Sequence, residues 1–247
     1  KLLSKNPSER PDSASEVVGI LEAIDSGGSI DALPTDSRGL HVLNSLASGV
    51  FVGREYEMQE LRSALDDALS GQGRLAMLVG EPGIGKTRVA SELETYAHLR
   101  GANVLWGRCH EQQGMPPFWP WIQAIRSYVR AHDPEQLRSE LGSGASVIAE
   151  IVPDINEVLP DLKPAELTSP DQARFQLFDA ITTFLKNISV QSKALLLILD
   201  DLQWADTPSL LLLEFLSQEL SDSHLMIIGT YRDCRTSAIM GRFQTWN

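Results

Sequence analysis

Residues 80–87 constrain this chain more than any other segment, because they fit the pattern G-x-x-x-x-G-K-[ST] at every fixed position. Their residues are Gly80, Glu81, Pro82, Gly83, Ile84, Gly85, Lys86 and Thr87. An apolar run at 75–79 precedes the segment and a helical pattern at 87–99 follows it, which is the context of a phosphate-binding loop. Glycines let such a loop turn its N–H groups inward, and the helix N-terminus adds positive potential. We therefore expect a bound nucleoside triphosphate, with Lys86 reaching the β- and γ-phosphates and the Thr87 hydroxyl binding Mg²⁺.

Composition fits a protein with a substantial core and an acidic surface. The chain has 247 residues, 43% of them hydrophobic, and a formal net charge of −12. This charge argues against a general nucleic-acid or anionic-membrane surface, although it leaves a local basic patch open. No apolar run approaches the roughly 20 residues of a membrane span. Cys109 and Cys234 have no metal-binding spacing, so we expect reduced thiols in a cytoplasmic protein.

The chain divides by composition into three parts. Residues 1–25 carry a short helical pattern, and residues 26–49 have the Gly- and Ser-rich composition of a linker. We expect one compact domain over 50–247, which begins with a helix at 55–69.

Strands and helices alternate at both ends of this domain. A helix at 87–99 lies between strands at 75–79 and 102–106, a βαβ unit that predicts a parallel sheet. The continuous apolar run 195–199 indicates a strand covered on both faces, and a further strand is expected at 225–230.

The middle of the domain has a different pattern. Helices are expected at 120–132, 134–141, 145–151 and 171–189, with a further helix at 208–219. The linkers hold Pro153, Pro160, Pro164 and Pro170, and we interpret the first four helices as a helical insertion packed on one side of the sheet. The prediction is an α/β fold with three layers, helices on both faces of a mainly parallel sheet.

Two carboxylates follow the buried strand directly. Asp200 and Asp201 would lie at the carboxyl edge of the sheet, where the phosphate loop also emerges. We expect Asp200 to hold Mg²⁺ together with Thr87, and Asp201 to polarise the attacking water as a general base. A helix-cap or turn role for the two acids is the alternative.

Arg232 follows the last predicted strand. If that strand lies beside the strand of Asp200, Arg232 points toward the γ-phosphate, where it can stabilise transferred charge. The alternative is an exposed arginine paired with Asp233.

Several motifs in order resemble the AAA-type signal-transduction ATPases with numerous domains, the STAND class. They are FVGRE at 51–55, the phosphate loop, GRC at 107–109, PPFWPW at 116–121, DDLQWAD at 200–206 and GTYR at 229–232. The resemblance implies a P-loop NTPase of the ASCE type, a three-layer αβα fold that is incomplete at its C-terminus here. The branch it resembles is fused to Ser/Thr kinases, nucleotide cyclases or LuxR-type DNA-binding domains.

This resemblance also implies a ligand and a cycle. Residues 52–54 would contact adenine and ribose, which makes ATP the expected nucleotide, and Arg232 would be the sensor arginine. ADP would hold a closed form and ATP an open, self-associating one, with slow hydrolysis resetting the state. Trp204 would lie in a loop that couples the nucleotide to the rest of the protein, or be a plain packing residue. The expected nucleotide contacts are Val52, Gly53, Arg54, Gly80, Glu81, Pro82, Gly83, Ile84, Gly85, Lys86, Thr87 and Arg88.

Residues 2–14 resemble the last helical stretch of a Ser/Thr kinase catalytic domain, in which Arg10 would match a structural ion-pair residue. The alternative is a generic amphipathic helix, and no kinase activity is expected in either case. The leading hypothesis is a regulatory ATPase module whose partners are the adenine nucleotide, an upstream kinase domain and downstream sensor or output domains. A nucleotide-binding interaction module with little hydrolysis, and an ATPase that acts on DNA, are the alternatives.

Overall fold

The computed structural model describes residues 54–111, 114–165 and 169–232. The kinase-like segment 1–25, the linker 26–49 and the expected contacts Val52 and Gly53 lie outside the described residues. The same is true of Asp233, the alternative partner of Arg232.

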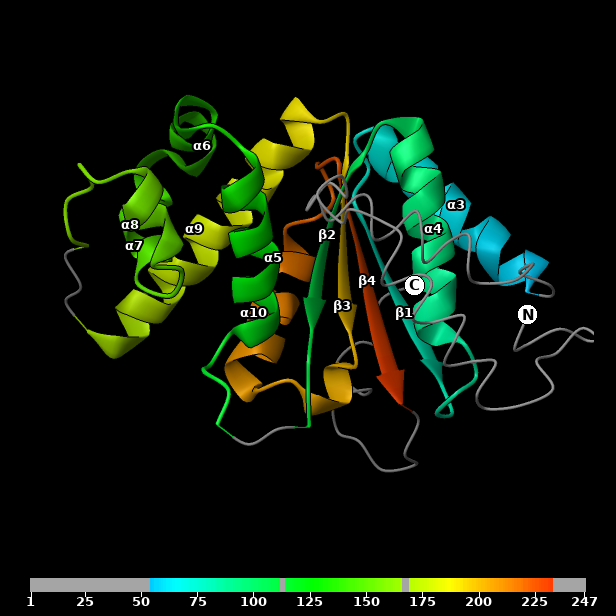
Figure 1. The fold of residues 1–247 in the computed structure, drawn as a ribbon. Coiled ribbons are helices and arrows are strands. Elements are labelled where there is room, and N and C mark those ends of the chain that lie inside the picture. Colours follow the sequence, from blue (N-terminus) through cyan, green and yellow to red (C-terminus); the bar gives the residue numbers. More distant parts are fainter. Residues whose placement is uncertain (1–53, 112–113, 166–168, 233–247) are drawn as a thin grey trace, which may run out of the picture. The chain divides into compact units, whose positions relative to one another are not determined.

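Four parallel strands form the sheet of the described residues, in the spatial order β1-β4-β3-β2 (Figure 1). They are β1 (Arg74–Gly80), β2 (Asn103–Arg108), β3 (Leu195–Asp200) and β4 (Leu225–Arg232). The parallel sheet is confirmed, and β3 is buried along its whole length as the apolar run predicts. The strands β1 and β2 are consecutive in sequence but stand apart, because β4 and β3 lie between them.

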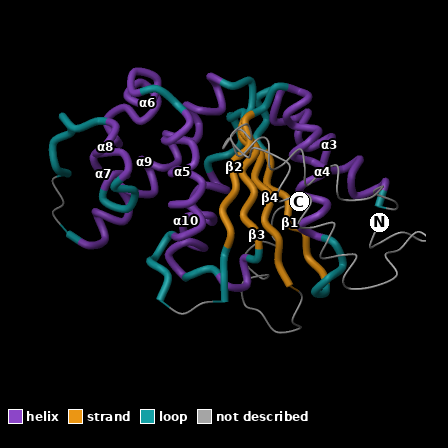
Figure 2. Tube along the Cα trace, in the orientation of Figure 1, coloured by secondary structure: helices purple, strands orange, loops and turns teal. Residues whose placement is uncertain are grey.

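Helices cover both faces of the sheet (Figures 1 and 2). On one face lie α3 (Glu55–Leu69) and α4 (Lys86–Arg100), and α4 contacts all four strands. The opposite face carries α5 (Trp119–Ala131), α9 (Pro170–Gln191) and α10 (Thr207–Gln218). Alternate residues of β3 divide accordingly: Leu195, Leu197 and Leu199 join the core beneath α5, α9 and α10, whereas Leu196 and Ile198 do not.

The helical insertion packs against α5 and α9, on one side of the sheet as expected (Figure 1). Its short elements are α6 (Pro134–Leu141), the 3₁₀ turn η3 (Gly142–Gly144), α7 (Ala145–Ala149) and α8 (Asp154–Val158). Asp133 caps α6 by accepting hydrogen bonds from the N–H groups of Glu135 and Gln136.

The predicted helix at 145–151 is too long, and α8 was missed. The α-helix ends at Ala149, and the chain becomes helical again at Asp154. Pro153 lies between the two helices and lacks the N–H that a continuous helix would need at this position. None of the helices in the described ranges is long and apolar enough to cross a membrane.

Gly107 of β2 fixes how closely α5 approaches the sheet. A Cβ atom at this position would lie 2.2 Å from the carbonyl oxygen of Pro120, a backbone atom that no rotamer change can move. We expect Gly107→Ala to lower the free energy of unfolding by about 1–3 kcal/mol, measured by chemical denaturation. Ser143→Ala, at an exposed position, is the control. An unchanged denaturation midpoint for Gly107→Ala would contradict this account of the packing.

Candidate nucleotide-binding site

The phosphate loop connects the end of β1 at Gly80 to the start of α4 at Lys86. Gly83 and Gly85 have φ angles of +78° and +97°, backbone conformations that favour glycine over other residues. Gly85 is the residue before the helix, so the loop leads directly into the α4 N-terminus. The local structure expected from residues 80–87 is present.

Lys86 folds back over the loop. Its Nζ donates hydrogen bonds to the carbonyl oxygens of Gly80, at 2.8 Å, and Glu81, at 2.9 Å. The residue is 8% exposed, so the ammonium is held at the loop and does not extend into solvent. An ammonium has three donors, which leaves capacity for a phosphate oxygen.

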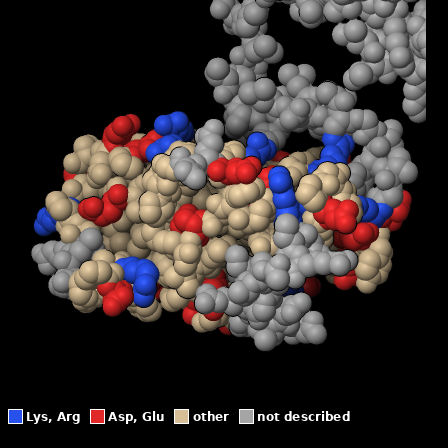
Figure 3. Space-filling model, turned by 90° about the horizontal axis from the view of Figure 1, so that it is seen from below, with Lys and Arg blue, Asp and Glu red and all other residues tan. Residues whose placement is uncertain are grey.

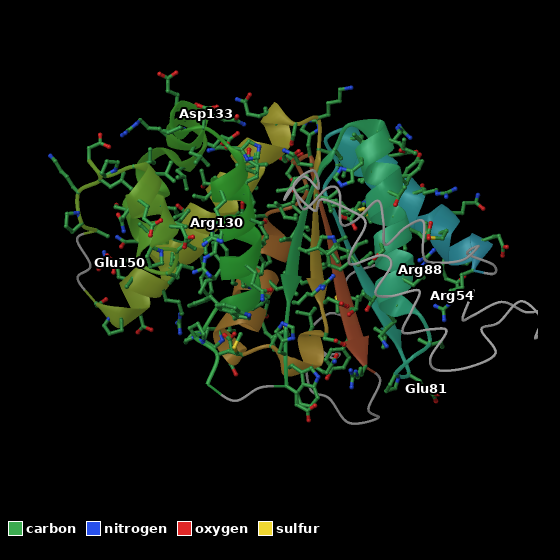
Figure 4. All side chains as sticks on the ribbon, viewed as in Figure 1. Arg54, Glu81, Arg88, Arg130, Asp133 and Glu150 are labelled. Atoms are coloured by element: carbon green, nitrogen blue, oxygen red, sulfur yellow. The ribbon has the colours of Figure 1, made fainter. Side chains whose placement is uncertain are left out.

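Arg54 contacts the phosphate loop through its side chain. Its Nη2 donates a 2.8 Å hydrogen bond to the carbonyl oxygen of Ile84. Arg88, the other expected arginine contact, forms an ion pair with Glu92 along α4 at 2.6 Å. Figure 4 shows Arg54, Glu81 and Arg88 on the α3 and α4 side of the sheet, whereas Arg130 belongs to α5 on the opposite side.

Asp200 ends β3 beside the start of α4. The Thr87 hydroxyl donates to this carboxylate, with Oγ1 lying 3.1 Å from Oδ1 and 3.2 Å from Oδ2. Thr230 of β4 donates to Oδ1 as well, at 2.6 Å. Asp200 is 5% exposed. Its carboxylate therefore contacts the helix that follows the phosphate loop and does not act as a helix cap.

Asp201 and Arg232 lie together at the ends of β3 and β4. The Arg232 Nε is 3.6 Å from the Asp201 Oδ1. Asp201 has a φ of 60° and precedes the 3₁₀ turn η4 (Leu202–Trp204), so it also has the turn role of the alternative interpretation. Gln203 of that turn donates from Nε2 to the Asp201 Oδ1 at 2.7 Å and accepts from the Arg232 N–H at 3.0 Å.

Sequence reasoning missed Thr230 and Gln203. Thr230 is fully buried and bonds both acids, because its hydroxyl also accepts from the Asp201 N–H at 2.8 Å. A hydroxyl residue inside the apolar run of β4 was an available signal for this role. Gln203 had no such signal, since its contacts depend on how η4 folds.

The residues at this edge fit a magnesium ion. Mg²⁺ prefers oxygen ligands and takes only one or two from the protein, completing its shell with water and phosphate oxygens. The Thr87 hydroxyl and the Asp200 carboxylate are such a pair. No group of three or more His, Cys, Asp or Glu side chains within the described ranges is arranged to hold a metal ion by itself.

A pocket of about 170 Å³ lies next to Asp200 and Asp201. Its lining includes Cys109, Trp119, Trp204 and Asp206. Burial, with Asp206, Asp201 and Asp200 nearby, raises the pKa of the Cys109 thiol to about 12. The raised pKa favours the neutral thiol form of this cysteine at pH 7. Trp204 is 40% exposed at the rim, whereas Trp121 is fully buried in the core.

Comparison with known proteins identifies a family. A family model described as the AAA ATPase domain matches residues 50–228. No curated protein matches the chain.

Solved structures show distant similarity. Cdc6p from Pyrobaculum aerophilum is 17% identical with a TM-score of 0.44, covering 80% of this chain and 44% of its own. A Walker-type ATPase of Pyrococcus abyssi is 14% identical with a TM-score of 0.41, covering 73% and 45%. A chain of Drosophila ORC bound to DNA is 12% identical with a TM-score of 0.36, covering 79% and 90%. This chain thus spans less than half the length of the first two proteins.

Proposed function

The chain belongs to the AAA ATPase domain family, and on that premise we propose that it is the ATP-binding regulatory module of a multidomain signalling protein. In this proposal Mg²⁺-dependent ATP hydrolysis acts as a conformational switch. The hydrogen bond between Thr87 and Asp200 supports it most strongly, because it joins two residues 113 positions apart in the sequence. It brings the phosphate-loop helix and the acid of β3 to one point, where a nucleotide-bound ion would sit.

Five side chains and the loop backbone have a role in the proposed reaction. Loop N–H groups bind the phosphates, and Lys86 neutralises charge on the β- and γ-phosphates. Thr87 and Asp200 would hold Mg²⁺, which when bound neutralises charge that develops on the phosphate oxygens. Asp201 orients a water molecule and accepts its proton as the water oxygen bonds to the γ-phosphorus. The bond from that phosphorus to the ADP oxygen breaks, and Arg232 stabilises the transferred charge.

The finer assignments depend on the motif resemblance. Adenine recognition by residues 52–54, membership of the STAND class and the kinase-like identity of residues 1–25 are parts of this proposal. So are an upstream kinase domain, downstream sensor or output domains, nucleotide-dependent self-association and a cytoplasmic location. The order of the motifs in the sequence supports them together.

A binding module with little or no hydrolysis is the second candidate. The observation in its favour is the ion pair between Asp201 and Arg232, since each side chain already has the other as a partner. A DNA-acting ATPase has less support, because the net charge is −12. Figure 3 looks onto the ends of the strands, and acidic and basic side chains are interspersed over the visible described surface. Salt-sensitive DNA binding would favour that third candidate.

Asp201→Asn separates the first two candidates. We expect phosphate release from Mg²⁺-ATP to fall about a hundredfold, because proton transfer to a positioned base contributes that order of rate enhancement. ATP affinity should change little, since the phosphate loop is untouched. Asp222→Asn, at an exposed position, is the matched control. Equal turnover in the wild-type chain and Asp201→Asn would overturn the general-base role of Asp201, and no turnover above background in either chain would leave the binding module.

A further inference from the structure

Gln203 connects the two strand ends that carry the proposed catalytic groups, and we infer that it is the positioning residue for both Asp201 and Arg232. This inference rests on the proposed function. The carboxamide of Gln203 donates to the Asp201 carboxylate at 2.7 Å and accepts from the Arg232 backbone N–H at 3.0 Å. One side chain thus bridges the end of β3 and the end of β4.

The chemistry of the two partners determines the orientation of this amide. A backbone N–H can only donate, so the Gln203 oxygen must face Arg232, and an ionised carboxylate can only accept, so the NH₂ group must face Asp201. With the amide reversed, its NH₂ group would face the Arg232 N–H and its oxygen would face the Asp201 carboxylate, so neither hydrogen bond could form. Neither glutamate nor methionine can satisfy both partners.

Arg232 depends on the Gln203 bridge because β4 extends beyond the last residue that pairs with β3. The pairing of β3 with β4 ends at Leu199 and Gly229, whereas β4 continues to Arg232, opposite Gly80 of β1. Beyond this point no strand in the described part of the chain lies beside β4 on the β3 side. The Gln203 side chain, from the segment that follows β3, supplies the hydrogen-bond acceptor for the Arg232 N–H. It therefore keeps the last residue of β4 in strand conformation and fixes the origin of the Arg232 side chain.

Asp201 depends on it for a different reason. Its backbone has the left-handed φ of 60°, and its N–H is fixed by the Thr230 hydroxyl. Its side chain is 34% exposed and otherwise meets Arg232 at 3.6 Å. The short bond from Gln203 is the contact that fixes the direction of the carboxylate, which decides whether a water molecule can be held in line with the γ-phosphate.

Two substitutions at position 203 test the inference. Gln203→Met keeps the length and removes both hydrogen bonds, and Gln203→Glu keeps the acceptor for Arg232 but sets a second carboxylate against Asp201. We expect each to lower kcat for Mg²⁺-ATP by about tenfold to a hundredfold, with the ADP dissociation constant within about twofold of wild type. Gln218→Glu, on the exposed end of α10, is the control.

A double-mutant cycle with Asp201→Asn separates positioning from general stability. In Asp201→Asn/Gln203→Glu the asparagine amide can donate to the glutamate carboxylate. This restores the hydrogen bond between positions 201 and 203 with donor and acceptor exchanged, but the carboxylate proposed as the general base is absent. We expect the double variant to recover thermal stability, with at least about fivefold non-additivity in the unfolding constant, while kcat stays at the Asp201→Asn level.

Unchanged kcat in Gln203→Met, additive unfolding effects in the cycle, or equal losses of kcat and ADP binding would each overturn the inference. A wild-type chain that binds ATP without turning it over would overturn the proposed hydrolysis instead. The unfolding cycle would then decide the bridge alone, since it needs no activity.

Discussion

Replacing Lys86 by alanine should weaken the binding of ATP and ADP by about a hundredfold or more. The physical reason is the loss of a charged donor that is already held at the loop by the Gly80 and Glu81 carbonyl oxygens. Hydrogen bonds to charged groups are each worth about 1.5–3 kcal/mol, and in the proposed function the ammonium would also neutralise charge on the β- and γ-phosphates. Calorimetric titration of each nucleotide measures the effect.

The matched control for this change is Lys163→Ala, which removes an exposed ammonium outside the site. It should leave nucleotide affinity unchanged, and circular dichroism should show both variants folded. Binding that survives Lys86→Ala at wild-type strength would remove the phosphate loop from the site and with it the basis of the proposed function.

Replacing Asp200 by asparagine should reduce Mg²⁺-stimulated ATP hydrolysis by at least about a hundredfold. The substitution keeps the side-chain size at a residue that is only 5% exposed, and the amide oxygen can still accept from Thr87. It removes the charge with which Asp200 would hold Mg²⁺ together with Thr87 in the proposed function, and a bound metal contributes several kcal/mol of charge stabilisation. Phosphate release measured across a magnesium titration should lose its metal dependence.

Nucleotide binding without magnesium provides the internal control for Asp200→Asn. We expect it to differ little from wild type, because the loop and Lys86 are unaltered. A variant whose hydrolysis still rises with magnesium as in the wild-type chain would show that Asp200 is not the metal-binding acid.

The parts of the site that the sequence predicts are those with local causes. The glycines, Lys86 and Thr87 are fixed by the turn that leads from β1 into α4, so their pattern suffices. Asp200 could be predicted because a strand buried on both faces must place the next polar residues at the sheet edge. The parallel sheet itself followed from alternating strands and helices.

Contacts between distant segments were beyond this reasoning. The hydrogen bonds of Thr230 to both acids require β4 to lie beside β3, a neighbourhood that periodicity does not specify. The ion pair between Arg232 and Asp201 could not be predicted either. It occurs where Asp201 has a left-handed backbone conformation, which is uncommon for a residue other than glycine. The helix α8 was missed since five residues carry too little periodicity to be recognised.

Titration of Mg²⁺-ATP, Mg²⁺-ADP and Mg²⁺-GTP into the wild-type chain, followed by calorimetry, tests the central claim most directly. The claim is that residues 80–87, Asp200 and the strand ends beside it form one adenine-nucleotide site. It predicts one molecule of ATP or ADP bound per chain, with GTP at least about tenfold weaker. The absence of binding heat for all three nucleotides, or equal affinity for GTP and ATP, would contradict it.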